Sequence, residues 1–433
     1  MTMIPVNSVA GYAAHGRITI DAEAINYTGT STNTAVCGGI DACFTGARRG
    51  VGGSAAASHS TGAAVFQNQC LIRATGTSGD SRRIVERATT SSVGGGSAMI
   101  VYAKNNGDGV PYYRLWDRVA GAWGTEATAN NVGADIHWLV LKFARTRNEA
   151  ILGSMNSSGQ IRVQVWNGDT LTWGAPQLIA TVTANNDNLY RGFDIDYETN
   201  SDRAVIVYND NTNSRFAYRT WDGATLSSQT TVNIPLGAKP RWIETAANPH
   251  STSNELAVIM LDRNNDVYGM RWTGAVWSNM GSGVAWDTDA ADSNFRPIGT
   301  VWESTSGRAL FVWGSNTNRR IYHRVWTGLA LSAPQFRDVA ALGGRVTWLR
   351  VVRDPYSEQI VSGVMNGGRD LNTAMWSGPP GDGWTDHPEH DANTEDGNDR
   401  NFDIVFETSA VRAGQAWLMW GGRVAGRSTK RRL

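Results

Sequence analysis

Short runs of apolar or alternating residues recur along this chain and are divided by polar turns. Residues 241–278 illustrate the pattern: the runs 241–245, 255–261 and 267–272 are followed by 275–277, and the turn 262–266 reads Asp-Arg-Asn-Asn-Asp. Runs of this length with a period of two, bounded by turn-forming residues, predict antiparallel β-strands joined as hairpins. No segment carries a useful apolar stripe of helical period. The pattern therefore predicts an all-β fold.

A tryptophan near a turn recurs at the end of one strand in each unit. These residues are followed by a glycine in most units: Trp116, Trp166, Trp221, Trp272, Trp326 and Trp376. Their successive spacings are 50, 55, 51, 54 and 50 residues, which is about the period of kelch-type propeller blades. Four-stranded antiparallel sheets repeated around an axis form a β-propeller, in which ring closure protects the sheet edges.

Two kinds of unit alternate. An arginine stands two residues before the tryptophan in every second unit, at Arg114, Arg219 and Arg324. Units of this class also carry a glutamate and an arginine five residues apart: Glu198 and Arg203, Glu303 and Arg308, Glu407 and Arg412. The other class begins its second strand with Glu149, Glu255 and Glu358. Equivalent positions recur every 104 to 106 residues, which indicates a duplicated two-blade unit.

The units predict a seven-bladed β-propeller of four-stranded antiparallel blades over residues 79–433, preceded by an irregular, β-rich N-terminal extension over residues 1–78. The last blade begins at Asn401 and the chain stops soon after Trp420, so at least one strand is missing. We therefore expect a segment of the first 80 residues, 18–25 or 63–72, to complete the ring. The recipient is either the same chain or a neighbouring one.

Composition narrows the function classes. The chain has 39 Lys and Arg against 39 Asp and Glu, so no net field favours nucleic acid or an anionic membrane. The chain contains no run of eighteen consecutive apolar residues, so no membrane span is predicted. The first residues do not have the pattern of a signal peptide. No cofactor or metal is expected. A disulfide between Cys37 and Cys43 would close a short loop and leave Cys70 over.

The candidate ligand-binding residues lie on the strand that ends at the tryptophan. Residues two apart on a strand share one face, so an arginine lies beside an indole in alternate units. An arginine fork next to an aromatic ring reads hydroxyls or carboxylates, or else it is a stacked structural pair. The set is Tyr113, Arg114, Trp116, Arg219, Trp221, His323, Arg324 and Trp326, with Tyr218 at the same position as Tyr113 and His323. The five-residue Glu and Arg pairs are expected to pin their turns.

These units resemble the blades of fucose-binding β-propeller lectins. The resemblance covers about residues 80–433 and rests on Trp221-Asp-Gly and Trp272-Thr-Gly turns, followed in several units by a second tryptophan: Trp123, Trp173, Trp277 and Trp384. It implies a non-enzymatic protein with sugar sites between blades that are built from an arginine, a glutamate and aromatic residues.

Signals for catalysis are sparse. Asp194, Asp196 and Glu198 would share one strand face, but glycosidases need two carboxylates at a set separation and no partner is indicated. His387 and His390 lie in an acidic loop that is better explained as solvated than as a metal site.

Three functions follow as hypotheses. The first is an exported, non-enzymatic, lectin-like or adhesive protein at the cell surface or outside the cell, whose partner is a glycan or cell-surface ligand. The alternative is a self-assembling structural subunit of a cell-surface filament or layer, a homo-oligomer or polymer in which the extension docks into the next protomer. A glycosidase is the second alternative. Nucleic acid and a membrane span are not expected in any of them.

Overall fold

The computed structural model describes residues 3–9, 16–21, 23–49, 55–63, 65–67, 86–89, 98–104, 107–117, 122–182, 187, 189–290, 292–339, 342–394, 400–406, 416–421 and 428–432. These residues form 35 strands in nine antiparallel sheets and contain no α-helix. In the part of the chain described, no helix is long and apolar enough to cross a membrane. The expected all-β fold is confirmed.

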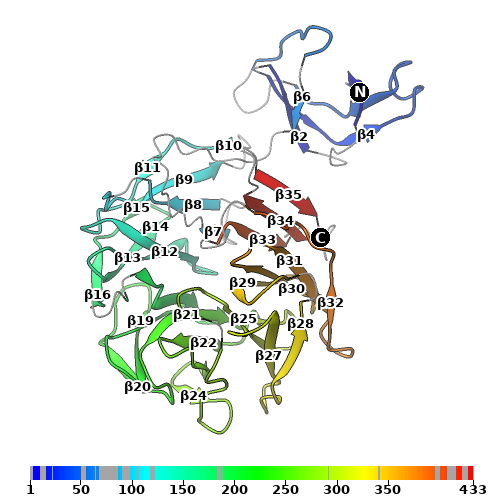
Figure 1. Cartoon of the computed structure of the whole chain (residues 1–433). Coiled ribbons are helices and arrows are strands. Elements are labelled where there is room, and N and C mark those ends of the chain that lie inside the picture. The colour runs from blue at the N-terminus through cyan, green and yellow to red at the C-terminus, as the bar shows by residue number, and fades with distance from the viewer. Residues whose placement is uncertain are drawn as a thin grey trace.

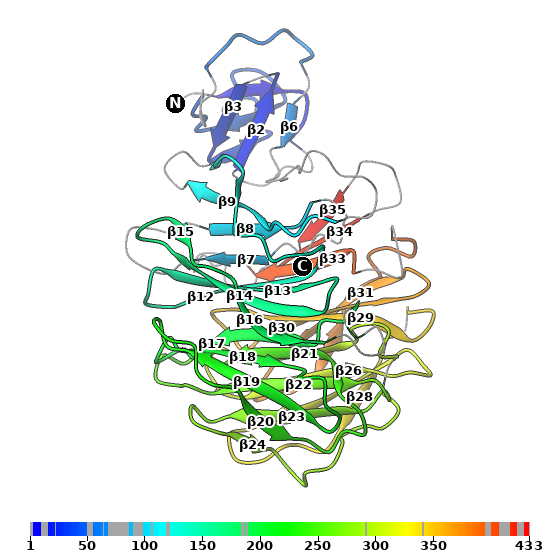
Figure 2. The same ribbon diagram turned by 90° about the vertical axis from the view of Figure 1, so that its left-hand side faces the viewer.

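Seven of the sheets follow one another along residues 86–432 and surround a common centre (Figure 1). Each successive sheet contributes its first strand to the centre, and these strands contact one another in order from β7 to β33. Both views place β33 beside β7 (Figure 1 and Figure 2). The first strands are β7 (Glu86–Thr89), β12 (Ile136–Phe143), β17 (Phe193–Tyr197), β21 (Pro240–Ala247), β25 (Ile298–Trp302), β29 (Val346–Arg353) and β33 (Phe402–Phe406).

Each sheet continues outward by antiparallel pairing. The second strands are β8 (Ala98–Tyr102), β13 (Glu149–Asn156), β18 (Ala204–Tyr208), β22 (Leu256–Asp262), β26 (Ala309–Gly314), β30 (Ile360–Asn366) and β34 (Ala416–Gly421). The third strands are β9 (Tyr112–Asp117), β14 (Gln160–Asn167), β19 (Arg215–Trp221), β23 (Val267–Trp272), β27 (Arg320–Trp326), β31 (Leu371–Trp376) and β35 (Ser428–Arg432). The outer strands are β10 (Ala122–Trp123), β11 (Ala127–Thr128), β15 (Thr172–Trp173), β16 (Gln177–Thr181), β20 (Thr230–Asn233), β24 (Trp277–Asn279), β28 (Gln335–Asp338) and β32 (Trp384–Asp386).

The second strands other than β34 are buried along their whole length, because neighbouring sheets cover both of their faces. Every residue of β18, Ala204 to Tyr208, is buried, as expected for a strand that packs on two sides. The sheets approach closely where glycines occur in these strands. A Cβ at Gly153 would lie 2.6 Å from Ile195 Cδ1, and one at Gly363 would lie 2.6 Å from Phe402 Cε2. The glycines therefore allow the next first strand to come into contact.

The N-terminal region forms two small sheets of its own, at the edge of the ring beside β9 and β35 (Figure 1 and Figure 2). They share a core of Ile18, Ile25, Tyr27 and Phe44. A disulfide joins Cys37 to Cys43, with their Cα atoms 5.5 Å apart; Cys70 lies outside the described residues. The strands are β1 (Ile4–Val6), β2 (Gly16–Ile20), β3 (Glu23–Tyr27), β4 (Gly29–Ser31), β5 (Ala42–Thr45) and β6 (Val65–Gln67).

Among the described residues, the last sheet has three strands, β33, β34 and β35, and none of them comes from the N-terminal region, so the expected completion within the same chain is not seen there. In the described residues, segments 18–25 and 63–72 supply β2, β3 and β6, which pair with one another. The third strand of the last sheet is instead the basic C-terminal tail: β35 pairs with β34 from Ser428 to Arg432. Strand pairing is made by backbone hydrogen bonds, which any sequence can form, so the polar side chains of this tail did not indicate a strand. The expected boundary at 78, and the pair Glu407 and Arg412, fall outside the described residues.

Candidate functional site

An arginine, a glutamate and a tryptophan meet at four successive interfaces between neighbouring sheets. In each cluster the tryptophan ends the third strand of one sheet, while the arginine and the glutamate belong to the preceding sheet. We call them interface clusters. They are Arg147–Glu149–Trp221, Arg203–Glu198–Trp272, Arg271–Glu255–Trp326 and Arg308–Glu303–Trp376.

In two interface clusters, which we call closed, the glutamate is shut off from solvent. Trp272 Nε1 donates to Glu198 Oε1 at 2.6 Å, and Arg203 pairs with the same oxygen at 2.5 Å. The Glu198 side chain is 0% exposed. The equivalent Glu303 is 1% exposed and receives bonds from Trp376 at 2.8 Å and Arg308 at 2.6 Å. Because each buried glutamate bonds to an arginine of its own sheet and to a tryptophan of the next, these two clusters fasten one sheet to the next.

The cluster at Trp221 is open. Glu149 Oε1 accepts bonds from Arg147 at 3.0 Å, Tyr197 Oη at 2.8 Å and Trp221 Nε1 at 3.1 Å. The Glu149 side chain nevertheless keeps 11% of its surface exposed and that of Arg147 keeps 30%. The Trp221 ring is half-buried, unlike Trp272, which is buried. This interface therefore offers an aromatic face, a cation and an oriented carboxylate to solvent.

The cluster at Trp326 is open at its charged side. Arg271 lies over the Trp326 ring, 5.0 Å from the centroid, and pairs with Glu255 at 2.6 Å. The side chains of Glu255 and Arg271 are 28% and 24% exposed. Trp326 Nε1 is buried and finds no hydrogen-bond acceptor among the residues described here. An unsatisfied buried donor is costly unless something bonds to it.

The sequence-predicted aromatic positions Tyr113, Tyr218 and His323 face the next sheet. Tyr113 packs edge-on against Trp166 and Trp173, with centroids 5.3 and 5.8 Å apart. His323 makes the same contacts with Trp376 and Trp384, at 5.2 and 6.1 Å, and Tyr218 does so with Trp272 and Trp277. Burial, reinforced by the positive charge of Arg337, lowers the pKa of His323 to about 4. These three side chains fill the interfaces between sheets.

The predicted arginines 114 and 324 donate hydrogen bonds within their own sheets, and Arg324 also lies over the ring of Trp286 from the preceding sheet, 5.3 Å from its centroid. Arg114 donates to the Gly124 carbonyl at 3.1 Å, and Arg324 donates to the Ser332 carbonyl at 2.8 Å. Arg219 is half-buried and its positive charge acts on the Tyr208 hydroxyl. The half-buried Trp116 packs against Trp123, with centroids 5.4 Å apart.

The structure therefore brings Trp221 and Trp326 together with arginines of the preceding sheet. Arg147 and Arg271 were not predicted, because each belongs to a different repeat unit from the tryptophan that it accompanies. The recurrence of Glu149 and Glu255 at the start of the second strand was the available signal.

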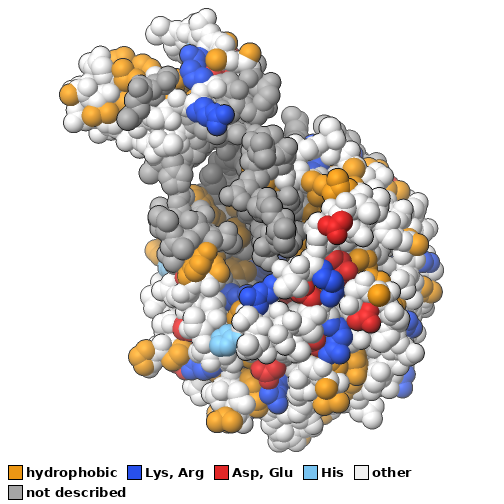
Figure 3. Space-filling view, turned by 180° about the vertical axis from the view of Figure 1, so that it is seen from behind, with side chains coloured by type: hydrophobic (Ala, Val, Ile, Leu, Met, Phe, Trp, Pro, Cys, Tyr) orange, Lys and Arg blue, Asp and Glu red, His pale blue; other side chains and the backbone are white. Residues whose placement is uncertain are grey.

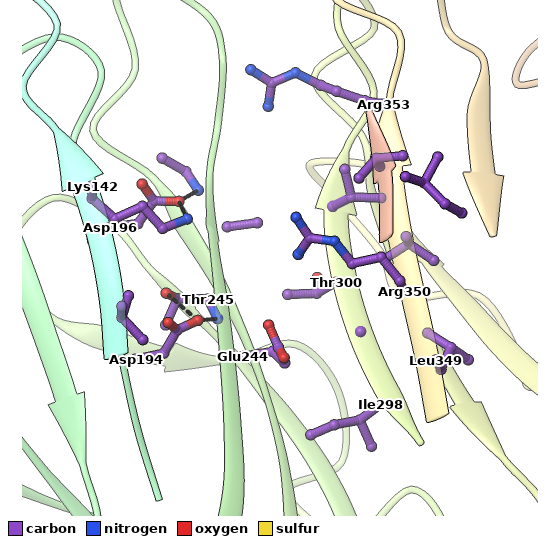
Figure 4. A pocket seen from close by; sticks show the side chains of 18 of the residues that line it. Lys142, Asp194, Asp196, Glu244, Thr245, Ile298, Thr300, Leu349, Arg350 and Arg353 are labelled. Carbon is purple, nitrogen blue, oxygen red and sulfur yellow. Dashed lines mark hydrogen bonds and ion pairs between the residues drawn. The ribbon is translucent and has the colours of Figure 1, made fainter. Parts of the chain in front are cut away.

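A second candidate site is a cavity of about 350 Å³ at the centre of the ring (Figure 4). Residues of six first strands or their flanks line it, among them the charged side chains Lys142, Arg191, Asp194, Asp196, Glu244, Arg296, Arg350 and Arg353. Figure 3 shows basic and acidic side chains close together across one face of the molecule.

Tryptophans from alternate sheets meet near the axis of the ring. Trp138 and Trp242 have centroids 5.3 Å apart, and Trp242 and Trp348 have centroids 6.1 Å apart, both edge-to-face. These tryptophans lie nearer the N-terminal ends of their strands than the charged residues of the cavity do. They form an apolar layer to one side of the cavity.

Two carboxylates of the cavity bond to the backbone of the next first strand. Asp194 accepts the Thr245 amide at 2.7 Å, and Asp196 accepts the Ala247 amide at 3.0 Å. These bonds satisfy the exposed inner edge of β21, where no further strand can pair. Burial raises the pKa of Asp194. Glu198 lies in a closed interface cluster instead, so the three carboxylates considered for a glycosidase do not form one site.

Glu244 is the acidic centre of the cavity. Arg191 pairs with it at 2.6 Å, and Arg296 forms a second ion pair with it. Its pKa is about 2: burial works against ionisation, but the surrounding arginines outweigh it.

His387 and His390 both contact the Thr373 hydroxyl, at 2.8 and 2.7 Å. Within the described ranges, no three His, Cys, Asp or Glu side chains are grouped to hold a metal ion.

No family model and no curated protein matches the chain. Among solved structures, the BP39L lectin from Burkholderia pseudomallei matches with a TM-score of 0.54 and 11% identity, over 78% of this chain and 92% of the lectin. The six-bladed fucose-recognising lectin from Aleuria aurantia gives 0.43 and 13% identity over 71% and 95%. AofleA from Arthrobotrys oligospora gives 0.45 and 12% identity over 71% and 87%. In its fold, the chain is similar to β-propeller lectins.

Proposed function

We propose that the protein is a non-enzymatic, lectin-like β-propeller that binds glycans at its open interface clusters. The observation that carries this proposal is the set at the Trp221 interface: a half-buried indole beside an oriented carboxylate and a partly exposed arginine. A sugar presents an apolar face that suits an aromatic ring, and its hydroxyls both donate to carboxylates and accept from arginine. A few convergent polar groups around an apolar surface are typical of small-ligand sites.

The difference between the interface clusters limits the sites to alternate interfaces. In the closed clusters, Glu198 and Glu303 have side-chain exposures of 0% and 1%, so a sugar hydroxyl cannot reach them without opening the interface. At Trp221 and Trp326 the glutamates are 11% and 28% exposed. The proposal therefore assigns one glycan site to each of these two interfaces.

The test is a glycan array that includes methyl α-L-fucoside, because the sequence resembles fucose-binding propeller lectins. Wild-type protein is compared with Trp221→Ala and Trp326→Ala, and Phe336→Ala serves as the matched control because Phe336 is a 52% exposed aromatic outside the interface clusters. The proposal predicts that each tryptophan variant weakens the same signals and that the control retains them. An array without signals would overturn it.

We further propose that the seven sheets close into a seven-bladed ring. The ordered contacts from β7 to β33, and the neighbouring positions of these two strands, support closure without a strand from the N-terminal region. Electron microscopy viewed along the axis would give seven radial densities if this is right. Six densities, as in the propeller of the Aleuria aurantia lectin, would contradict it.

We also infer that the protein is exported and acts at the cell surface or outside the cell. The disulfide between Cys37 and Cys43 supports this inference, since such bonds persist in oxidising compartments. Mass spectrometry of alkylated protein from the culture medium and from the cells tests it; a reduced protein that stays inside the cells would contradict it. The alternative, a self-assembling subunit in which the extension docks into the next protomer, stays a proposal, because the last sheet has three strands among the described residues and β35 is its outer edge.

A further inference from the structure

The central cavity carries more positive than negative charge. Its lining includes Lys142 and four arginines, at 191, 296, 350 and 353, against three carboxylates, at 194, 196 and 244. Arg400 and Asp403 act electrostatically on this cluster from nearby and cancel each other. Five cations against three anions leave an excess of two positive charges.

The carboxylates of the cavity are already engaged. Glu244 pairs with Arg191 and Arg296, and Asp194 pairs with Arg191 at 3.2 Å. Asp196 accepts a backbone amide and lies 3.5 Å from Lys142. Arg350 pairs with Asp403 at 3.3 Å, which leaves Arg353 as the lining cation without an ion pair among the described residues.

Two arginines of the cavity lack an acceptor or a counter-charge that a bound anion would supply. The Arg353 side chain forms no ion pair or hydrogen bond with any residue that the structure describes, and Asp196 is the carboxylate that favours its charge from a distance. The Arg296 side chain is only 7% exposed, and its buried Nε has no acceptor within the described part of the chain. Burying a cation or leaving a buried donor unsatisfied costs free energy.

Mutual repulsion adds to this cost. Burial and the neighbouring charges of Arg400, Arg191 and Arg350 lower the pKa of Arg296 to about 9, although Glu244 favours its charged form. A guest anion would supply both the missing charge and the missing acceptors.

We propose that the central cavity binds a small molecule that carries a carboxylate, sulfate or phosphate group. Arginine forks match the geometry of these groups with paired hydrogen bonds. In Figure 4, Arg350 and Arg353 reach into the space from β29, opposite Asp194, Asp196 and Glu244. A volume of about 350 Å³ falls within the range of small-ligand pockets and exceeds the needs of a single inorganic ion. This site differs from the interface clusters in both place and chemistry.

Isothermal titration of the full chain at low ionic strength tests the proposal with three probes: inorganic sulfate, inorganic phosphate and D-glucuronate. These probes distinguish an inorganic anion from a carboxylate on a sugar ring. We expect saturable binding of at least one probe at one site per chain. The variant Arg353→Gln removes a charge that holds no internal partner in the described residues, so the fold should survive. Its affinity should fall about tenfold, the loss expected for a charged hydrogen bond.

The matched control is Arg320→Gln, which removes an arginine that pairs with Asp338 at the surface. Its affinity for the probes should equal that of wild type. A double variant, Trp221→Ala with Trp326→Ala, should also bind them normally, which separates this site from the proposed glycan sites. The proposal is overturned if wild type binds none of the probes saturably, or if Arg353→Gln binds them as tightly as wild type.

Discussion

Trp221 Nε1 donates a 3.1 Å hydrogen bond to Glu149 Oε1 across the interface between two neighbouring sheets. The same contact recurs between Trp272 and Glu198, at 2.6 Å, in an interface of the other class. The two differ in burial: the Glu149 side chain is 11% exposed and the Glu198 side chain is 0% exposed. The bond between Trp272 and Glu198 therefore fastens two sheets, whereas the bond between Trp221 and Glu149 orients a carboxylate that solvent can reach.

This difference predicts unequal costs for the same substitution. Trp272→Phe leaves the buried Glu198 without its indole donor, so the free energy of unfolding should fall by about 1–3 kcal/mol. Trp221→Phe should cost less than about 1 kcal/mol, because water can replace the lost donor at Glu149. Urea unfolding of both variants measures the difference. Equal losses of unfolding free energy in the two variants would show that the two clusters contribute equally to stability, which would contradict this prediction.

Close packing between sheets gives a second prediction. Gly153→Ala places a methyl group 2.6 Å from Ile195 Cδ1, and overpacking of this kind costs about 1–3 kcal/mol. Gly381 has no atom within 4 Å of such a methyl group, so Gly381→Ala should change stability by less than about 0.5 kcal/mol. Denaturant midpoints of the two variants provide the comparison. A Gly153 variant as stable as the control would disprove the close contact.

Buried His323 predicts a specific dependence on pH. Its folded pKa of about 4 lies below the ordinary value of 6.5, so between these values the unfolded chain binds a proton that the folded chain does not. Its contribution is therefore fully present above pH 6.5 and is lost as the pH falls toward 4, by at most about 3 kcal/mol.

The variant His323→Tyr introduces the residue found at the equivalent positions 113 and 218. Melting temperatures at pH 7 and pH 4.5 should differ less for this variant than for wild type. An equal drop in both proteins would mean that His323 takes up its proton without cost.

Strand pairing predicts opposite effects of two truncations. Removing residues 1–67 should leave the melting temperature of the propeller unchanged, since β2, β3 and β6 pair with one another. Removing residues 428–433 should lower it, because β34 loses its partner from Ser428 to Arg432. Differential scanning calorimetry tests both. Destabilisation by the N-terminal truncation alone would restore the earlier expectation that this region completes the ring.

The repeat was readable from the sequence because each unit needs an aromatic residue where its third strand ends. Trp166, Trp272 and Trp376 fill that position, and all three are buried. The five-residue pair of Glu198 and Arg203 was also readable, because both residues belong to one hairpin.

The interface clusters were not predicted, because their members come from different units. Glu149 precedes Trp221 by 72 residues and Glu198 precedes Trp272 by 74, so strand alternation within one unit cannot reveal either contact. The central cavity is assembled in the same way from side chains of several first strands, such as Arg296 and Arg353. The pairing of β35 depends on backbone hydrogen bonds, which leave little trace in a basic tail.

The most direct test of the account is a calorimetric titration with the glycan that gives the strongest array signal. Wild type, Trp221→Ala, Trp326→Ala, the double variant and Phe336→Ala are compared under the same conditions. We predict that each single tryptophan variant loses one site, that the double variant binds nothing measurable, and that Phe336→Ala matches wild type. Undiminished glycan binding by the double variant would contradict the assignment of the sites to the open interface clusters.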